Sequence, residues 1–199
     1  WIIARLNQLI TTITGGLDSY DLFGPTRAIR EFCDDLSTWY LRRSRDRLKD
    51  GDVGAKQTLY MVLKTVSKLM APFAPFTAED LWQKLRLGRA SMDGARHDPA
   101  GSDEESVHLS VWPKGGDVDH NNLILMEKVR EFCTLGNSER KKLNIPVRQP
   151  LQSISVVYKF EDHQLMQLIK DELNVKEVSW STPEKGEVIL DTQITPELK

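Results

Sequence analysis

The chain has 199 residues, of which 40% are hydrophobic and 28% are charged, and its formal net charge is −2. This composition is typical of a soluble globular protein, and the length suits one domain with or without a small appendage. It excludes a strongly basic protein, so any function in nucleic-acid binding must rest on local clusters of basic residues. No hydrophobic run approaches the roughly 18 residues that a membrane span needs.

Two features bear on where the protein works. Cys33 and Cys133 both fall in predicted helices, which favours reduced thiols in a cytoplasmic protein over a disulfide scaffold. Trp1 already lies inside an amphipathic pattern, with no Met or N-cap before it, and no signal peptide is visible. We therefore expect the chain to be a piece of a longer cytoplasmic protein.

Hydrophobic residues at three- and four-residue spacing predict four helices in the first part of the chain. They cover about residues 1–20, 24–49, 55–71 and 77–87. Gly24 and Pro25 are expected to open the second helix, as its N-cap and its first helical residue. Thr77 is expected to open the fourth, with Asp80 completing a variant of the capping box.

The second part of the chain changes character. A polar linker at about 88–106 and a weakly alternating surface segment at 107–113 precede a fifth helix at 121–143, which Asn144 ends as a left-handed cap. Strands are then predicted at 154–158, 175–180 and 187–191, with a helix at 161–173 and a turn at 182–186. The predicted fold class is mainly α: a helical bundle over residues 1–145, followed by a small α/β subdomain over 146–199.

Motifs for catalysis are absent from the sequence. It contains no G-x-x-x-x-G-K-[ST] loop, no H-E-x-x-H or C-x-x-C metal spacing and no G-x-S-x-G turn. The four histidines are scattered along the chain at His97, His108, His120 and His163. We therefore predict neither a catalytic residue nor a metal site in this chain.

The strongest local signal is the run WYLRRSR at residues 39–45, which ends a hydrophobic helical row. At about 100° per residue, Arg43 and Arg47 would fall on that buried row, whereas Arg42 and Arg45 would point away from it. A charged side chain on a buried row means either that the helix extends beyond the hydrophobic core or that it contacts a polyanion there.

Two interpretations of these four arginines stay open. Cations at the end of a helix complement its dipole, and arginine forks also bind phosphate oxygens. Trp39, at the edge of the row, is the better candidate for stacking on a base, because Tyr40 has the spacing of a core residue.

A second basic group follows at Arg140, Lys141 and Lys142, again in the last turn of a predicted helix. Arg148 and Gln149 come after a proline, in an extended segment where the dipole argument does not apply. For Arg148 an interdomain salt bridge and an RNA contact are both consistent with the sequence.

Several stretches, taken in order, resemble the anticodon-binding part of the isoleucyl-tRNA synthetases, a family of class I aminoacyl-tRNA synthetases. They are WIIARLN at 1–7, RAI at 27–29, DDLSTWYLRRSR at 34–45, LMAPFAPFTAE at 69–79, SVHL and WP within 106–113, and VRQPL at 147–151. The runs at 39–45 and 147–151 point to the isoleucine enzyme, whereas the others are shared loosely with valyl and leucyl enzymes. The resemblance covers about residues 1–151.

The resemblance implies a module that holds the anticodon arm of isoleucine tRNA, with no cofactor, membrane or DNA partner of its own. Catalytic and editing domains elsewhere in the parent chain would attach isoleucine to the tRNA, with ATP and Mg²⁺. The implied tRNA-binding residues are Trp39, Arg42, Arg43, Arg45, Arg47, Arg140, Lys141, Lys142, Arg148 and Gln149. The alternatives are a scaffold domain whose arginines form intramolecular salt bridges, and the equivalent domain of a valyl enzyme.

Overall fold

The computed structural model describes residues 1–92, 104–181 and 188–191. Its contacts divide the chain into two compact units, Trp1–Asp119 and His120–Lys199. Unit 1 is helical, and unit 2 combines helices with a small sheet. The mainly helical fold class with a small α/β part is therefore confirmed.

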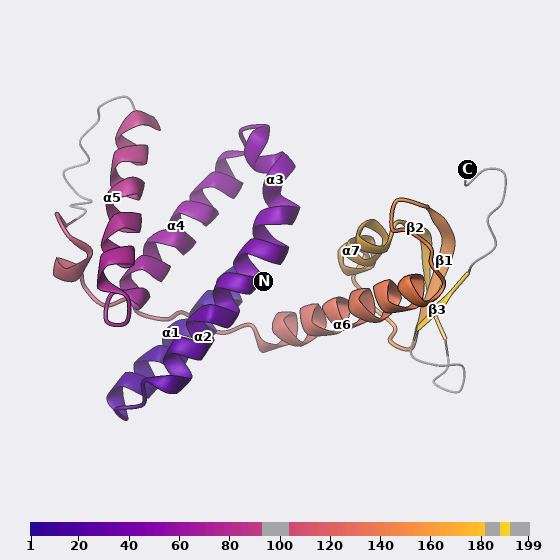
Figure 1. The fold of residues 1–199 in the computed structure, drawn as a ribbon, viewed down its shortest axis with the longest axis horizontal. Helices are drawn as coiled ribbons and strands as arrows, with labels where there is room; N and C mark the ends of the chain where they lie inside the picture. Colours follow the sequence, from indigo (N-terminus) through magenta and orange to yellow (C-terminus); the bar gives the residue numbers. More distant parts are fainter. Residues whose placement is uncertain (93–103, 182–187, 192–199) are drawn as a thin grey trace. The chain divides into compact units, whose positions relative to one another are not determined.

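Unit 1 consists of helices, and those between Ile2 and Met92 follow one another directly or through short turns (Figure 1). They are α1 (Ile2–Asp18), α2 (Phe23–Asp35), the π-helix η1 (Leu36–Leu41), α3 (Arg42–Lys49), α4 (Val53–Met70), α5 (Pro75–Met92) and the 3₁₀ turn η2 (Val107–Leu109). The helix α1 lies beside α2, and α4 lies beside α5. The predicted second helix is thus one rod in which a π-helical segment separates two α-helices.

The core of unit 1 is formed by the inner faces of α1, α2 and α4. Ile13, Phe32, Val62 and Leu69 are fully buried in it. Each such side chain contributes about 1.5–3 kcal/mol by leaving water. The hydrophobic spacing of the sequence therefore identified the faces that hold the bundle together.

Two predicted helix starts are wrong. The helix α2 begins at Phe23 rather than after Gly24, because the Asp21 carboxylate accepts hydrogen bonds from the N–H groups of Phe23 (2.9 Å) and Gly24 (3.3 Å). The helix α5 begins at Pro75, whose fixed φ suits a first helical residue. Thr77 therefore lies inside the helix and is not its cap.

Hydrogen bonds hold the segment after residue 103 against α5. The Glu79 carboxylate accepts hydrogen bonds from the Ser106 hydroxyl (2.8 Å) and the Val107 N–H (2.9 Å). The Trp82 indole donates to the carbonyl of Glu104 (3.0 Å). Val107 is only 2% exposed, so the prediction that the segment 107–113 lies wholly at the surface is wrong. The expected linker at 88–106 begins inside α5, which continues to Met92, and residues 93–103 lie outside the described part.

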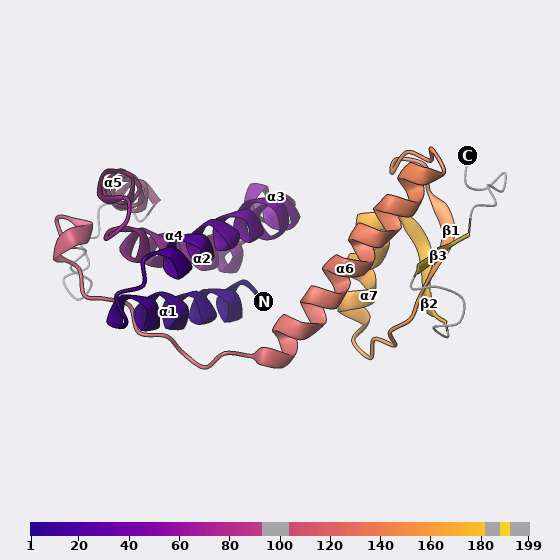
Figure 2. The ribbon, with the colours of Figure 1, turned by 60° about the horizontal axis from the view of Figure 1, so that its bottom comes forward.

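Unit 2 is a three-stranded sheet covered by two helices on one face (Figure 2). The elements are α6 (His120–Lys142), β1 (Leu151–Val156), α7 (His163–Leu173), β2 (Val175–Trp180) and β3 (Val188–Leu190). The strand order is β2-β1-β3, with β1 parallel to β2 and antiparallel to β3. Ile154 pairs with Val178 on one side and with Leu190 on the other. The predicted turn at 182–186 lies outside the described residues.

The helix α6 packs against the sheet of unit 2. A Cβ atom on Gly136 would lie 2.6 Å from Cδ1 of Leu173, so only glycine permits this close approach of α6 to α7. The rings of Phe132 and Phe160 meet edge to face, with centroids 6.0 Å apart. Asn144 has a φ of +54°, which confirms the left-handed cap. The sequence-based division at residue 145 grouped this helix with the bundle, whereas its packing partners lie in unit 2.

The guanidinium of Arg140 holds the interior of unit 2 together. It is 1% exposed, and it donates to the carbonyl oxygens of Pro146 (3.2 Å), Gln149 (2.9 Å), Leu173 (2.6 Å) and Asn174 (3.2 Å). Burial lowers the pKa of this guanidinium from its ordinary value. Carbonyl dipoles at the end of α7 and in the α6–β1 loop therefore compensate a desolvated cation.

Replacing Arg140 with methionine should destabilise unit 2 by about 2–4 kcal/mol, because one buried and three partly buried hydrogen bonds from its guanidinium to carbonyl groups are lost. Hydrogen exchange measured by mass spectrometry should show β1 losing protection while α4 in unit 1 keeps it. Lys141→Met is the matched control, since Lys141 is exposed and its loss should leave β1 protected. Equal protection of β1 in both variants would contradict this role for Arg140.

The acceptor role of Glu79 predicts a pH dependence of stability. Hydrogen bonds from Gln83, Ser106 and Val107, with the nearby charge of His108, lower the pKa of the Glu79 carboxyl. A lowered folded-state pKa adds stability above the ordinary glutamate pKa of roughly 4.3, and that stability is lost as the pH falls through the folded value.

Glu79→Gln should therefore lower the melting temperature at pH 7 and lose this effect as the pH approaches about 3. Asp80→Asn, which changes an exposed carboxylate on the same helix, should show little difference at either pH. A Glu79→Gln effect that stays constant from pH 7 to about pH 3 would rule out the ionised carboxylate as the cause.

Candidate nucleic-acid interface

The site begins with a widened turn of the α2–α3 rod, the π-helix η1 at Leu36–Leu41. Two hydroxyl side chains bond back to carbonyls at its start: Ser37 Oγ to the Cys33 carbonyl (2.8 Å) and Thr38 Oγ1 to the Asp34 carbonyl (2.6 Å). Such bonds compete with the backbone ladder and bend helices. The consecutive Ser37 and Thr38 thus lie at the start of the widened turn, and π-helical turns are frequent at functional sites.

The widened turn changes which side of α3 faces the core. At a uniform 100° per residue, Arg43 and Arg47 continue the buried row, but in the structure Ser44 is buried and Leu48 is half-buried, whereas Arg47 is exposed. A π-helical turn takes in one additional residue. The buried row therefore moves on by one position after Tyr40. The expected place of Arg47 on the core side is wrong, whereas Arg43 is half-buried.

An ion pair fixes the start of this turn. Asp35, the last residue of α2, accepts from Nε and Nη2 of Arg5 on α1, both at 2.9 Å from Oδ2. The Asp35 side chain is only 8% exposed, so the pair is screened less than a surface pair. Because Asp35 directly precedes η1, this contact ties the widened turn to the neighbouring helix.

Trp39 and Arg42 form a stacked pair on η1 and the first turn of α3. Arg42 Nε donates to the Thr38 carbonyl (2.8 Å), and its guanidinium carbon lies 5.7 Å from the centroid of the Trp39 ring. Trp39 is half-buried and Arg42 is exposed. An indole ring partly held by the protein, with a guanidinium over it, presents both a stacking surface and phosphate donors.

The other arginines of this run differ in their surroundings. Arg43 is half-buried and Arg45 is exposed. Among the described residues, no hydrogen bond or ion pair engages the side chain of Arg45. Arg47 instead pairs with Asp52 (2.7 Å), whose carboxylate also caps α4 through the Ala55 N–H (3.0 Å). Arg45 is therefore the freer of these cations, whereas Arg47 has a structural partner.

The second predicted group lies around the end of α6 in unit 2. Lys141 and Arg148 are exposed and, within the described part of the chain, have no side-chain partner. Lys142 pairs with Glu139 (2.6 Å), and the half-buried Gln149 donates to the Pro150 carbonyl (3.2 Å). Arg140, in contrast, is buried among the four carbonyls described above. Its predicted RNA contact therefore needs correction, because no guanidinium edge reaches the surface.

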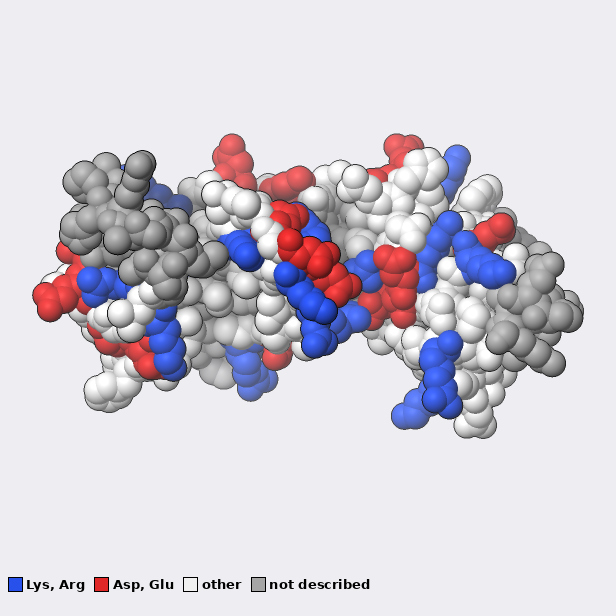
Figure 3. Space-filling model, turned by 90° about the horizontal axis from the view of Figure 1, so that it is seen from above, with Lys and Arg blue, Asp and Glu red and all other residues white. Residues whose placement is uncertain are grey.

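The structure thus brings the predicted residues together in two separate sets, one in each unit. On the face of the molecule in Figure 3, lysine and arginine side chains are interleaved with aspartate and glutamate. The described residues there form no continuous basic field. Binding of an anion at this face would therefore depend on individually placed cations rather than on an extended charged surface.

One basic group was missed in the sequence. Lys56, Tyr60, Lys64 and Lys68 recur every four residues along α4, and all are half-buried. The ammonium groups of Lys64 and Lys68 lie 5.3 and 5.6 Å from the ring centroid of Trp82. The four-residue spacing was visible in the sequence, but the aromatic partner on α5 was not.

Two features that the described residues lack bear on other site types. No group of three or more His, Cys, Asp or Glu side chains is arranged there to hold a metal ion. Within the same residues, none of the helices has both the length and the apolar character to cross a membrane.

Known proteins resemble this chain along most of its length. The isoleucine–tRNA ligase of Clostridium tetani is 39% identical over 189 residues, which cover 89% of this chain and 17% of that enzyme. That of Clostridium acetobutylicum is 40% identical over 187 residues, covering 90% of this chain and 17% of the enzyme. That of Streptomyces avermitilis is 36% identical over 197 residues, covering 96% and 18%. The chain spans less than a fifth of the length of these relatives.

The family comparison covers both the widened turn and the helix α6. Residues 1–157 match the family model for the anticodon-binding domain of tRNA ligase, and these residues include Trp39, the neighbouring arginines and the basic end of α6. With most of its length matched, the chain belongs to the family of anticodon-binding domains of tRNA ligases.

Proposed function

We propose that this chain is the anticodon-binding part of an isoleucine–tRNA ligase and that it holds the anticodon arm of isoleucine tRNA. Support comes from its family, from the names of its relatives, and above all from the stacked Trp39–Arg42 pair on the widened turn. Sequence-specific binding of RNA targets unstacked loop bases, which stack on aromatic rings and arginine planes. An anticodon loop presents such bases.

In this proposal the arginines of η1 and α3 contact the RNA backbone. Arg42, Arg43 and Arg45 lie within about one turn at the start of α3, and the exposed Arg45 has no competing partner among the described residues. Each phosphate neutralised on a single strand contributes about −0.7 to the slope of log affinity against log salt. Arg47 contributes less, because its pairing with Asp52 must loosen first. Trp39 supplies the stacking surface for a base.

Unit 2 supplies a second contact at the end of α6. Lys141 and Arg148 are exposed cations without a described partner, and Lys142 and Gln149 adjoin them. Lys142 would exchange its surface pair with Glu139 for a phosphate at low cost, because surface ion pairs contribute only about 0–1 kcal/mol. Arg140 has no part in this contact and instead supports the loop that carries Arg148.

The remaining steps belong to the rest of the parent enzyme. There, catalytic and editing domains would use ATP and Mg²⁺ to attach isoleucine to the 3′ end of the tRNA and would remove mischarged valine, in the cytoplasm. This chain supplies none of that chemistry in the proposal. Its residues hold one end of the tRNA while the other end reacts.

A scaffold function is the second candidate, and one observation favours it: Arg47 and Arg140 make intramolecular contacts. A scaffold gives no account, however, of Arg45, Lys141 and Arg148, which are exposed cations without a described partner. RNA binding and folding stability therefore have to be measured on the same variants.

The double variant Arg42→Gln/Arg45→Gln should weaken binding of isoleucine tRNA about tenfold, or about 1.4 kcal/mol. It should also reduce the salt slope by about 1.5, since two phosphate contacts are lost. Filter binding or fluorescence anisotropy across a salt series measures both quantities. The matched control is Arg27→Gln/Arg30→Gln, which removes the same charge from exposed positions on α2. Unchanged RNA affinity combined with a lowered melting temperature in the first variant would favour the scaffold.

Trp39→Leu should weaken tRNA binding by about 1–3 kcal/mol, the usual contribution of one stacked base. The salt slope should stay unchanged, because no cation is removed. Trp39→Phe keeps an aromatic face and should recover a large part of the affinity. If leucine and phenylalanine at position 39 bind equally well, stacking at this position is excluded. The melting temperature of both variants shows whether the half-buried ring matters for folding.

A further inference from the structure

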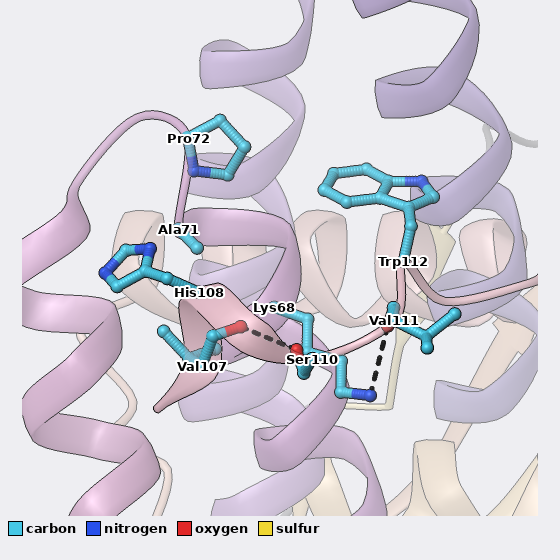
Figure 4. A pocket seen from close by; sticks show the side chains of 8 residues that line it. All are labelled: Lys68, Ala71, Pro72, Val107, His108, Ser110, Val111 and Trp112. Atoms are coloured by element: carbon cyan, nitrogen blue, oxygen red, sulfur yellow. Dashed lines mark hydrogen bonds between the residues drawn. The ribbon is translucent and has the colours of Figure 1, made fainter. Parts of the chain in front are cut away.

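A small pocket lies in unit 1 beside the end of α4, away from the widened turn in the chain. Its walls include Lys68, Pro72, His108, Ser110, Val111 and Trp112 (Figure 4). The volume is about 210 Å³, below the roughly 300–1,000 Å³ of sites for drug-sized ligands. A single planar ring is therefore a better match to the pocket than a larger molecule.

The aromatic wall of the pocket is held rigidly. The indole N–H of Trp112 donates to Thr14 Oγ1 (3.0 Å), and the ring packs against the main core of unit 1. In Figure 4 the Trp112 ring and the Pro72 ring stand on opposite sides of the opening, and His108 lies on the side of Pro72. A preformed aromatic face loses little conformational entropy when a ring stacks on it.

The polar part of the pocket is cationic. Lys68 Nζ donates to the Val111 carbonyl (3.2 Å) while lying over the Trp82 ring, and so its ammonium is held at the wall. His108 is exposed beside it, and the carboxylate of Glu79, which interacts electrostatically with His108, is engaged by Ser106 and Val107. No aspartate or glutamate lines the pocket itself.

The charge around the pocket favours an anionic occupant. Lys68 is the last member of the row in which Lys56, Tyr60 and Lys64 precede it at four-residue intervals along α4. The row thus offers three ammonium groups and one aromatic side chain, and it ends at a pocket large enough for one ring. This arrangement suits a nucleic-acid backbone, whose phosphates would contact the ammonium groups while one unstacked base enters the pocket.

We infer that this pocket receives one unpaired nucleotide of the bound RNA, with its base against Trp112 and its phosphate at Lys68 and His108. The inference rests on the proposed function for the identity of the RNA, but the pocket can be tested without tRNA. The base is held by stacking and the phosphate by charge, so a base and a phosphate are both needed for binding.

The first test is an NMR titration of the chain with its tryptophan indoles labelled with ¹⁵N. Adding AMP or UMP should shift the Trp112 indole signal, which Trp112→Phe identifies, while the Trp39 and Trp180 signals stay nearly in place. Ribose 5-phosphate, which carries no base, should shift it much less. If neither nucleotide at millimolar concentration moves the Trp112 signal, the pocket does not bind a nucleotide and the inference is overturned.

The second test uses variants in tRNA binding. Lys68→Gln and His108→Gln should each weaken affinity about three- to tenfold, and Lys68→Gln should lower the salt slope by about 0.7–0.9. Lys84→Gln, an exposed lysine on α5 that pairs with Asp80 (2.6 Å), is the matched control and should bind as the unaltered chain does. Crosslinking with tRNA that contains 4-thiouridine should attach to residues 106–114 in the unaltered chain and much less in Lys68→Gln.

The outcomes separate this inference from the proposed function. Weaker tRNA binding in Arg42→Gln/Arg45→Gln, with no effect of Lys68→Gln and no nucleotide shift, would overturn the pocket alone. A nucleotide shift at Trp112 without any tRNA binding by the chain would support the pocket and overturn the proposed function. Burial of Val111 by another domain in the parent enzyme, seen as hydrogen-exchange protection of 107–112 that tRNA does not alter, would assign the pocket to protein docking and overturn the inference.

Discussion

The widened turn at Leu36–Leu41 is the constraint on which the candidate RNA surface of unit 1 depends. A regular α-helix would carry two arginine side chains of α3 onto the row that packs in the core. Desolvating a guanidinium without a partner costs several kcal/mol. The π-helical segment instead brings Ser44 to the core side, leaves Arg42, Arg45 and Arg47 exposed and keeps Arg43 half-buried. The ion pair between Asp35 and Arg5 holds the point where the register changes.

The arginines of this chain show that the function of a basic residue depends on the groups around it. Arg140 lies in the last turn of α6, where the helix dipole favours cations, whereas Arg45 lies in the middle of α3. The carbonyls around Arg140 take up its donors, and its charge stabilises the interior of unit 2. Arg45 has no such acceptors among the described residues, so a phosphate is the partner it can gain at least cost.

Much of the fold follows from local patterns in the sequence, and the differences have specific causes. Hydrophobic period predicted the helices and the strand Val175–Trp180, because each depends on neighbours within a few residues. The π-helical turn escaped prediction, since a uniform 3.6-residue period was assumed. The structural role of Arg140 was not predicted because its acceptors Leu173 and Asn174 lie more than 30 residues further along the chain. A contact of that kind depends on the tertiary fold, which a basic residue at a helix end does not reveal.

The candidate site was predictable to a similar degree. The run at 39–45 predicted Trp39 and its neighbouring arginines as candidates, because it places an aromatic residue beside clustered cations. The lysine row ending at Lys68 was overlooked, since lysines spaced along an exposed helix face have an ordinary structural explanation. Only the position of Trp82 on α5, against Lys64 and Lys68, gives the row a second component. The spacing of residues within α4 alone cannot predict this contact with a side chain on α5.

The near-neutral charge of the chain decides how such a surface can work. With a net charge of −2 and acidic groups interleaved with basic ones, the field beyond about 8–10 Å is largely cancelled in physiological salt. Long-range attraction therefore contributes little, and each cation acts only once a phosphate is within reach. In the proposed function, affinity would then come from several short-range contacts, with candidates at the Trp39–Arg42 pair, at the end of α6 and along α4. An RNA that fits only one of these contact sites would gain only the small binding free energy of that site. Shape complementarity between RNA and protein would therefore discriminate between RNA molecules, which net charge cannot do.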